Sequence, residues 1–142
     1  MDYERMALTY METMYQMRKR HSHKQINDSM HGENFVLFFI SRNDGKVIPS
    51  DISNEMGITS ARVAAALNSL EAKGMIVRRI DAEDRRRILI EITESGKEQA
   101  HKQYRMIMSM VIHMLEHLGE EDSLEFIRIM KKLASMEPDN FI

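Results

Sequence analysis

Residues 58–96 of the chain read ITSARVAAALNSLEAKGMIVRRIDAEDRRRILIEITESG. The first part of this stretch predicts a helix, because Thr59 or Ser60 can cap its start and a glycine, Gly74, can end it just after Lys73. Apolar residues recur along this helix at spacings of three and four and define its expected buried face. The residues of that face are Val63, Ala66, Leu67 and Leu70.

The second part of the stretch predicts a β-hairpin with an arginine-rich loop. Residues 76–80 and 88–92 alternate β-branched with polar side chains, so the two segments are expected to pair. The loop between them ends in Asp84, Arg85, Arg86 and Arg87. Asp84 can orient one of the neighbouring guanidinium groups. A charged turn of this kind can also be a solvated surface feature without a ligand.

A short helix precedes this stretch. Pro49 suits the first turn of a helix over residues 50–56, and Gly57 ends that helix by allowing a left-handed backbone. Ile58 is expected to fill the angle between the two helices. Two short helices joined by such a turn are typical of a helix-turn-helix, whose second helix lies in the major groove of DNA.

Residues near the start of the second helix are therefore the expected DNA contacts. They are Thr59, Ser60, Ala61 and Arg62 and, farther along, Ala65 and Asn68. Arg62 suits guanine O6 and N7, and Ser60 suits a phosphate together with exposed helix amides. The alanines at 64–66 either keep the helix slim enough for close approach to the groove or simply favour a helix.

The adjacent hairpin supports the DNA-binding interpretation. A narrow minor groove has a strongly negative potential and attracts inserted arginine side chains. Residues 60–87 hold seven cationic and four acidic side chains, although the net charge of the whole chain is −2. Because phosphate binding needs only a locally positive face, the weakly acidic average does not exclude a nucleic-acid partner.

At these residues the chain resembles the multiple-antibiotic-resistance regulator (MarR) family of bacterial winged-helix transcription factors. The family signature is Asp, any residue, Arg, five residues, Leu or Ile, Thr, two residues and Gly. The chain carries it with every spacing intact, as Asp84, Arg86, Ile92, Thr93 and Gly96. Residues 70–78 (LEAKGMIVR) and 49–52 (PSDI) are also similar to the family pattern.

The resemblance implies a fold, a partner and roles for single residues. The fold would be mainly α-helical with a small β-hairpin wing: a winged helix-turn-helix with N- and C-terminal dimerisation helices. Arg86 would enter the minor groove with Asp84 as its orienting partner, and Ser60 and Arg62 would contact the major groove. The implied function is a sequence-specific transcriptional regulator, usually a repressor, that binds a palindromic double-stranded DNA operator as a homodimer.

The remaining elements are expected from helical periodicity and turn residues. We expect a single protomer over residues 1–142, with the winged helix-turn-helix region at 30–92 and dimerisation helices at 1–20 and 93–142. Within these regions the expected elements are helices from Tyr3 to about Arg20 and over 30–42, 93–118 and 120–136, a loop at 21–28 and a short strand at Val47–Ile48.

The predicted helix over residues 93–118 independently suggests a dimer. One of its faces forms a core stripe of Tyr104, Ile107, Val111, Leu115 and Leu118. Further apolar residues make the helix apolar almost all round: Met106, Met108, Met110, Ile112 and Met114. Such a helix needs burial on more than one side, which a partner chain supplies. The two winged helix-turn-helix regions of such a dimer, its DNA-reading heads, would then bind DNA half-sites roughly 34–36 Å apart.

Bulk composition limits the class of protein. A chain of 142 residues with 43% hydrophobic and 30% charged residues fits one domain or one protomer with a core of its own. The absence of cysteine excludes disulfides, thiolate metal sites and cysteine redox sensing. Neither a membrane-spanning apolar run nor the layout of a signal peptide is recognisable, so a cytoplasmic protein without a membrane partner is expected.

The fourteen methionines suggest a pliable pocket for an effector. We expect that pocket between the dimerisation helices and the DNA-reading region, near Tyr10, Met14, Phe38 and Met108, with a small aromatic or phenolic molecule as its ligand. Ordinary packing in the core or at the interface is the alternative for each of these residues.

Two histidines are weak candidates for a metal site. His113 and His117 stand four residues apart on one helix face, a spacing that can chelate a metal. Further ligands could come from His21, His23, His31 and His101. Because no cysteine and no His-Glu-x-x-His pattern accompanies them, we expect surface histidines and neither a metal nor another cofactor.

Three alternatives to a ligand-responsive DNA-binding regulator remain at this point. One is a zinc-responsive regulator that uses these histidines. Another is a winged-helix protein-interaction module that does not read DNA. An enzyme is the least expected, because no polar pocket with a base and a nucleophile is recognisable.

Overall fold

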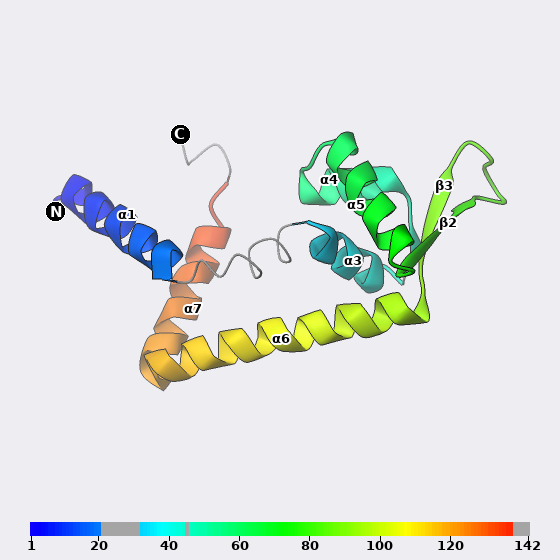
Figure 1. The fold of residues 1–142 in the computed structure, drawn as a ribbon. Coiled ribbons are helices and arrows are strands. Elements are labelled where there is room, and N and C mark those ends of the chain that lie inside the picture. Colours follow the sequence, from blue (N-terminus) through cyan, green and yellow to red (C-terminus); the bar gives the residue numbers. More distant parts are fainter. Residues whose placement is uncertain (21–31, 45, 138–142) are drawn as a thin grey trace. The chain divides into compact units, whose positions relative to one another are not determined.

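The computed structural model describes residues 1–20, 32–44 and 46–137. The chain divides into two compact units, Met1–Ala100 and His101–Ile142, each of which is considered by itself. The elements in order are α1 (Tyr3–Arg20), α3 (Glu33–Arg42), β1 (Lys46–Val47), α4 (Pro49–Met56), α5 (Ser60–Ala72), β2 (Ile76–Ile80), β3 (Ile88–Ile92), α6 (Glu94–Leu118) and α7 (Glu120–Ala134) (Figure 1). No helix in the described ranges is long and apolar enough to cross a membrane.

The predicted elements are confirmed wherever the structure describes them. The predicted loop at 21–28 and residues 30 and 31 of the helix predicted over 30–42 lie outside the described residues. That helix begins at Glu33 instead of within residues 30–32, because Gly32 is its N-cap. The two hairpin segments pair as expected, and β1 adds a third strand, in the antiparallel order β1-β3-β2. Together these helices and strands form the mainly α-helical winged helix-turn-helix that the sequence predicts.

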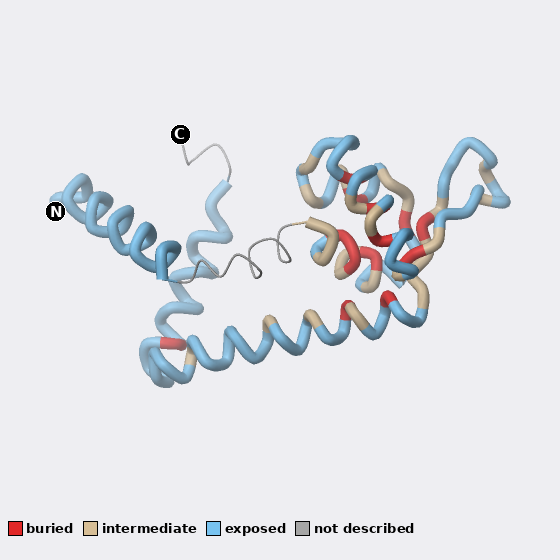
Figure 2. The backbone as a smooth tube through the Cα atoms, viewed as in Figure 1, coloured by how far each residue is buried: buried red, intermediate tan, exposed pale blue. Residues whose placement is uncertain are grey.

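The apolar core of the first unit lies between α3, α4, α5, the sheet and the start of α6 (Figure 2). Its buried members are Val36, Leu37, Ile40, Val47, Ile52, Val63, Leu67, Leu70, Ile76, Ile90 and Ala100. Three of the four residues predicted for the buried face of α5 belong to this core. Ala66 is only partly buried, because it lies at the edge of that face.

Two predicted boundaries shift by one residue, one at the first strand and one at the end of α5. The first strand covers Lys46–Val47 rather than Val47–Ile48, because Ile48 caps α4 and donates its N–H to Asp51 Oδ2 at 3.1 Å. Helix α5 ends at Ala72 rather than Lys73. Gly74, with φ +72°, turns the chain there, and the next N–H donates back to Leu70 O at 2.9 Å.

The last two helices are also slightly shorter than predicted. Helix α6 begins at Glu94 rather than at 93, because Thr93 lies outside the helix and caps its N-terminus. Helix α7 ends at Ala134 rather than at 136, since Ser135 is its C-cap. Fraying and capping make the ends of a helix the least predictable part of its sequence.

The junction between β3 and α6 is closely packed. Thr93 donates its N–H to Met75 O at 3.0 Å and its hydroxyl to Gly74 O at 2.7 Å, while its Oγ1 accepts the N–H of Gly96 at 3.0 Å. A Cβ on Gly96 would lie only 2.1 Å from Met75 O, so glycine alone allows the two backbones to approach this closely. The first turns of α6 therefore belong to the same packed body as the helix-turn-helix.

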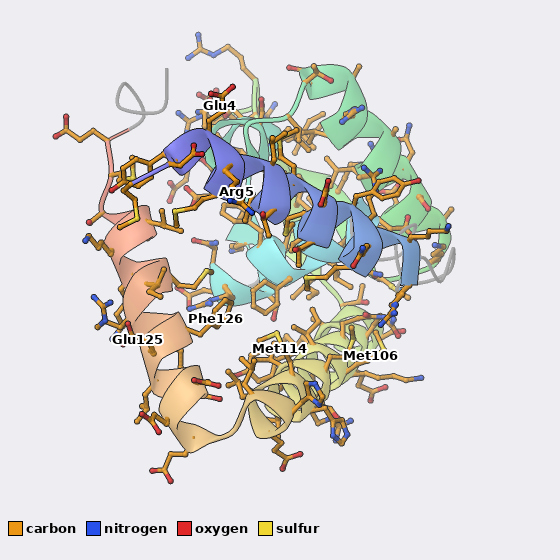
Figure 3. The ribbon with its side chains drawn as sticks, turned by 90° about the vertical axis from the view of Figure 1, so that its left-hand side faces the viewer. Glu4, Arg5, Met106, Met114, Glu125 and Phe126 are labelled. Atoms are coloured by element: carbon orange, nitrogen blue, oxygen red, sulfur yellow. The ribbon has the colours of Figure 1, made fainter. Side chains whose placement is uncertain are left out.

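The second unit is a pair of helices joined at Gly119, where φ is +83°. The Ser123 hydroxyl donates to Leu115 O at 2.8 Å and closes this corner. None of the five residues predicted as the core stripe of α6 is fully buried: Ile107 and Leu115 are half-buried, and the other three are exposed. Met106 and Met114 on α6 and Phe126 on α7, labelled in Figure 3, are each about 40% exposed.

Candidate nucleic-acid interface

The helix-turn-helix is built as the sequence predicts. Helix α4 ends at Gly57, whose φ of 61° and ψ of 32° place it in the left-handed region. Ile58 packs partly buried against the core, and its carbonyl accepts a hydrogen bond from Ser53 Oγ at 3.0 Å. These contacts brace the turn, so the position of α5 relative to α4 is determined by packing as well as by the backbone.

The first turn of α5 presents polar groups to solvent. Thr59 is the N-cap, and its Oγ1 accepts the N–H of Arg62 at 3.2 Å, which resolves the choice between Thr59 and Ser60. Ser60, Ala61 and Arg62 are exposed. The start of a helix carries unpaired N–H groups and a partial positive charge, so this turn can bind an anion such as a phosphate.

The wing loop has a well-braced backbone. Asp81 N–H donates to Arg87 O at 3.0 Å, and Arg87 N–H donates to Asp84 O at 2.9 Å. Asp81 also accepts the backbone N–H of Glu83 at 3.0 Å. The hairpin extends beyond the helices of the first unit (Figure 1). The loop therefore has a defined shape at an exposed position.

Asp84 orients the arginine predicted for the minor groove. Its Oδ1 accepts both the backbone N–H of Arg86, at 3.1 Å, and the Nε–H of the same residue, at 3.2 Å. Arg87 Nε lies 3.7 Å from the other carboxylate oxygen. The side-chain hydrogen bond from Arg86, with a backbone one, lowers the pKa of Asp84. The side chain of Arg86 is 92% exposed, so the Nε edge of its guanidinium is held while the two terminal nitrogens are open to a ligand.

Charged residues continue across the sheet from the wing. Glu91 on the central strand β3 lies 3.4 Å from Arg79 Nε on β2 and 3.8 Å from Lys46 Nζ on β1. Both cations are largely solvent-exposed, whereas the Glu91 side chain is 27% exposed. Ion pairs between exposed side chains contribute little to stability, so these three charged residues matter chiefly for the local electrostatic potential.

One residue of the site was missed by the sequence reasoning. Arg78 on β2 donates to both carboxylate oxygens of Glu71 on α5, at 2.9 and 3.1 Å, and its Nη2 donates to Asn68 Oδ1 at 2.8 Å. The side-chain hydrogen bond from Arg78 lowers the pKa of Glu71. A signal was present, because the alternation of β2 puts Arg78 on the same face as buried Ile76, where a cation needs a partner.

Asn68 was predicted as a DNA contact and is exposed on α5. A guanidinium can only donate, so the amide oxygen of Asn68 must face Arg78, and its NH2 group is left to donate elsewhere. Ala65 is exposed one turn earlier on the helix. Contacts of Ala65 and Asn68 with DNA stay predictions.

One of the four residues predicted for the effector pocket lines a cavity within the first unit. Phe38 lines an open cavity of about 930 Å3 formed by α3, the following turn, β1 and α4, and Arg42 stacks 5.5 Å from the centre of its ring. Tyr10, Met14 and Met108 are not among the residues that line this cavity. A pocket formed by all four stays a prediction.

The histidines show no cluster in the described ranges. His113 Nδ1 lies 3.4 Å from Glu116 on the same helix face. Within residues 1–20, 32–44 and 46–137, no three His, Cys, Asp or Glu side chains gather as a metal site would require. His21, His23 and His31 lie outside those ranges.

Comparison with known proteins places this geometry in a family. A model described as the MarR family matches residues 35–87, from α3 to the end of the wing loop. The HTH-type transcriptional regulator YwhA of Bacillus subtilis, itself uncharacterized, is 31% identical over 129 residues, which is 90% of each chain. The HTH-type transcriptional repressor YetL of the same organism is 24% identical over 98 residues, or 69% of this chain and 59% of YetL.

A solved structure shows the same fold. FabT of Streptococcus pneumoniae, crystallised in complex with DNA, is similar with a TM-score of 0.71 and 23% identity, over 94% of this chain and 95% of FabT. The sequence similarity to YwhA runs through nine-tenths of both chains, and the matched model spans the helix-turn-helix together with the wing loop. The chain therefore belongs to the MarR family of transcriptional regulators.

Proposed function

We propose that this MarR-family regulator is a homodimeric, ligand-responsive repressor of a palindromic DNA operator. The observation that supports this most is the wing: Arg86 is 92% exposed at a braced hairpin tip, with its guanidinium oriented by Asp84. A side chain that is already oriented loses less conformational entropy when it enters a groove. The names of YetL, a repressor, and of FabT, solved with DNA, point to the same activity.

The proposed docking uses two elements of one packed body. The exposed first turn of α5 would enter the major groove, where Arg62 donates to guanine O6 and N7 and Ser60 contacts a phosphate. The wing would lie in the neighbouring minor groove, with Arg86 inserted and Arg85 and Arg87 close to the phosphates. Base contacts would then come from the helix and affinity largely from the cations.

The exposed apolar surface of the terminal helices supports the homodimer. In the described part of the second unit only Ser123 is buried, while large apolar side chains are exposed along α6 and α7. Helix α1 likewise has no buried residue. Exposed apolar surface of this extent is rare on a monomer. The exposed residues are Tyr3, Met6, Leu8, Tyr10, Met11, Met14, Tyr15, Met17, Tyr104, Met106, Met108, Met110, Val111, Ile112, Met114, Leu118, Leu124, Phe126, Ile127, Ile129, Met130, Leu133 and Met136.

A small aromatic or phenolic effector would act by selecting one spacing of the two heads. Binding can shift this equilibrium only by the difference in the effector's affinity for the DNA-competent and the DNA-incompetent dimer. The aromatic side chains that line the cavity beside Phe38 fit a molecule with an aromatic ring, and Arg42 and Asp44, which also line it, could bind polar groups such as a phenolic hydroxyl. Loss of operator binding on addition of phenolic acids would be the expected result.

The test is a binding titration on DNA fragments selected by the protein from random or genomic DNA. Arg62→Ala and Arg86→Ala should each weaken binding by about 1–3 kcal/mol, and a lost phosphate contact should reduce the slope of log K against log salt by about 0.9. Lys131→Ala on α7 is the charge-matched control and should leave affinity unchanged. If no fragment is bound in low salt, or if Lys131→Ala and Arg86→Ala behave alike, the proposed function is wrong.

A further inference from the structure

The guanidinium of Arg78 forms hydrogen bonds that join the wing hairpin to α5, the helix proposed to enter the major groove. Arg78 is in the middle of β2, the strand that leads into the wing loop, and pairs across the sheet with Ile90 of the core. From there it reaches Glu71 and Asn68, which lie near the end of α5. Among the described residues, no other side-chain hydrogen bond or ion pair joins α5 to the hairpin.

The geometry of this contact is specific to arginine. The Nε–H and Nη2–H groups meet the two oxygens of Glu71 at 2.9 and 3.1 Å, which is a bidentate arrangement. The third hydrogen bond, at 2.8 Å, holds the Asn68 amide. A lysine at this position could contact the carboxylate but could not reproduce the planar fork.

We propose that Arg78 is a positioning residue that sets the wing at the angle from α5 at which both can engage DNA together. The inference rests on the proposed DNA-binding function. In this account Arg78 does not touch a phosphate itself, because its donors on this side already have protein acceptors. Its side chain is 31% exposed, compared with 92% for Arg86. Glu71 has the same role although it carries the charge that DNA repels.

The negative charge of Glu71 allows a positioning role to be distinguished from a purely electrostatic effect on DNA affinity. Removing a carboxylate near a DNA-binding surface reduces charge repulsion, so Glu71→Gln should bind DNA more tightly if only the local potential matters. Under the positioning account the same change frees Arg78 and releases the wing, so operator binding becomes weaker. The two accounts therefore predict opposite signs for one isosteric substitution.

The experiment is a double-mutant cycle in the full-length protein. Operator affinity and its salt slope are measured for wild type, Glu71→Gln, Arg78→Gln and the double variant, with Glu83→Gln in the wing loop as a charge-matched control. We expect each single variant to bind about 3- to 10-fold more weakly, the double variant to be no weaker than Arg78→Gln, and Glu83→Gln to bind as tightly as wild type or more tightly. The salt slope of both single variants should equal that of wild type.

Two results would overturn the proposal. One is a Glu71→Gln protein that binds as tightly as Glu83→Gln. The other is a salt slope lowered by about 0.9 in Arg78→Gln, which would make Arg78 a phosphate contact. Circular dichroism checks that each variant is folded, and Glu71→Gln decides the question if Arg78→Gln does not fold. Parallel measurement of Arg86→Ala keeps the proposals apart: if Arg86→Ala loses affinity while Glu71→Gln does not, DNA binding stands and the positioning role fails.

Discussion

Replacement of Gly96 by alanine tests the packed junction between β3 and α6. The new Cβ would lie 2.1 Å from Met75 O and 2.7 Å from Ile92 Cγ1. An ordinary contact between carbon and oxygen is about 3.3–3.6 Å, so the helix and the turn before β2 must separate by roughly 1 Å. The nearest of these atoms, Met75 O, belongs to the backbone, so a rotamer change cannot relieve that clash.

The cost of that separation follows from the bonds across the junction. Thr93 makes two hydrogen bonds to the carbonyls of Gly74 and Met75, each worth about 0.5–1.5 kcal/mol. Overpacking adds about 1–3 kcal/mol. Alanine is favoured over glycine in a helix by at most about 1 kcal/mol, which offsets part of the loss. With the full offset of about 1 kcal/mol subtracted, the net expectation is a destabilisation of about 1–5 kcal/mol.

The assay is urea denaturation at a fixed protein concentration, because the stability of a dimer depends on concentration. Ser95→Ala is the matched control: Ser95 precedes Gly96 on the same helical turn and is exposed, so alanine there should be neutral or slightly stabilising. The reasoning is refuted if Gly96→Ala unfolds at the same urea concentration as Ser95→Ala.

Three further predictions concern the core, the start of the recognition helix and the wing. Leu37→Ala, at a fully buried position, should destabilise the protein by about 2–5 kcal/mol in the same urea assay, and a loss below 1 kcal/mol would contradict the described core. Thr59→Ala should cost about 1 kcal/mol by removing the N-cap, whereas Thr59→Ser should retain most of the stability; equal stability of the two would count against that cap. Hydrogen bonds from Arg86 lower the pKa of Asp84 in the folded protein below the ordinary value of 3.8. The contribution of the ionised Asp84 carboxylate to the free energy of unfolding is therefore complete at pH values above 3.8. It is lost as the pH falls through the lower pKa of the folded state. An NMR titration of the Asp84 carboxyl carbon should therefore have its midpoint below 3.8 in wild type and nearer to 3.8 in Arg86→Ala, and a wild-type midpoint at or above 3.8 would rule out the ordered tip.

Local sequence patterns were sufficient to predict most of the winged helix-turn-helix. The spacing of Val63, Leu67 and Leu70 identified the buried face of α5, since a helix repeats every 3.6 residues. The alternation in residues 76–80 and 88–92 predicted that these two segments pair as a hairpin. Gly57 and Thr59 marked the turn because their preferred roles, a left-handed end and an N-cap, are properties of short segments.

Features that depend on distant partners could not be predicted in this way. Gly96 was known only as part of a signature, because its close neighbour Met75 lies 21 positions earlier in the chain. The contact of Arg78 with Glu71 requires the angle between α5 and β2, which no pattern specifies. Likewise, the apolar stripe of α6 indicated which residues favour burial, but three of its five members are exposed in the described chain, and their partner could not be read from the sequence.

Footprinting on a selected genomic fragment tests most directly whether paired heads read DNA together. The account predicts two protected half-sites of inverted sequence, with centres about 10–10.5 base pairs or a multiple of this apart, and minor-groove protection beside each that disappears in Arg86→Ala. A single protected half-site bound by a monomer, or protection that is the same with and without the Arg86 side chain, would contradict it.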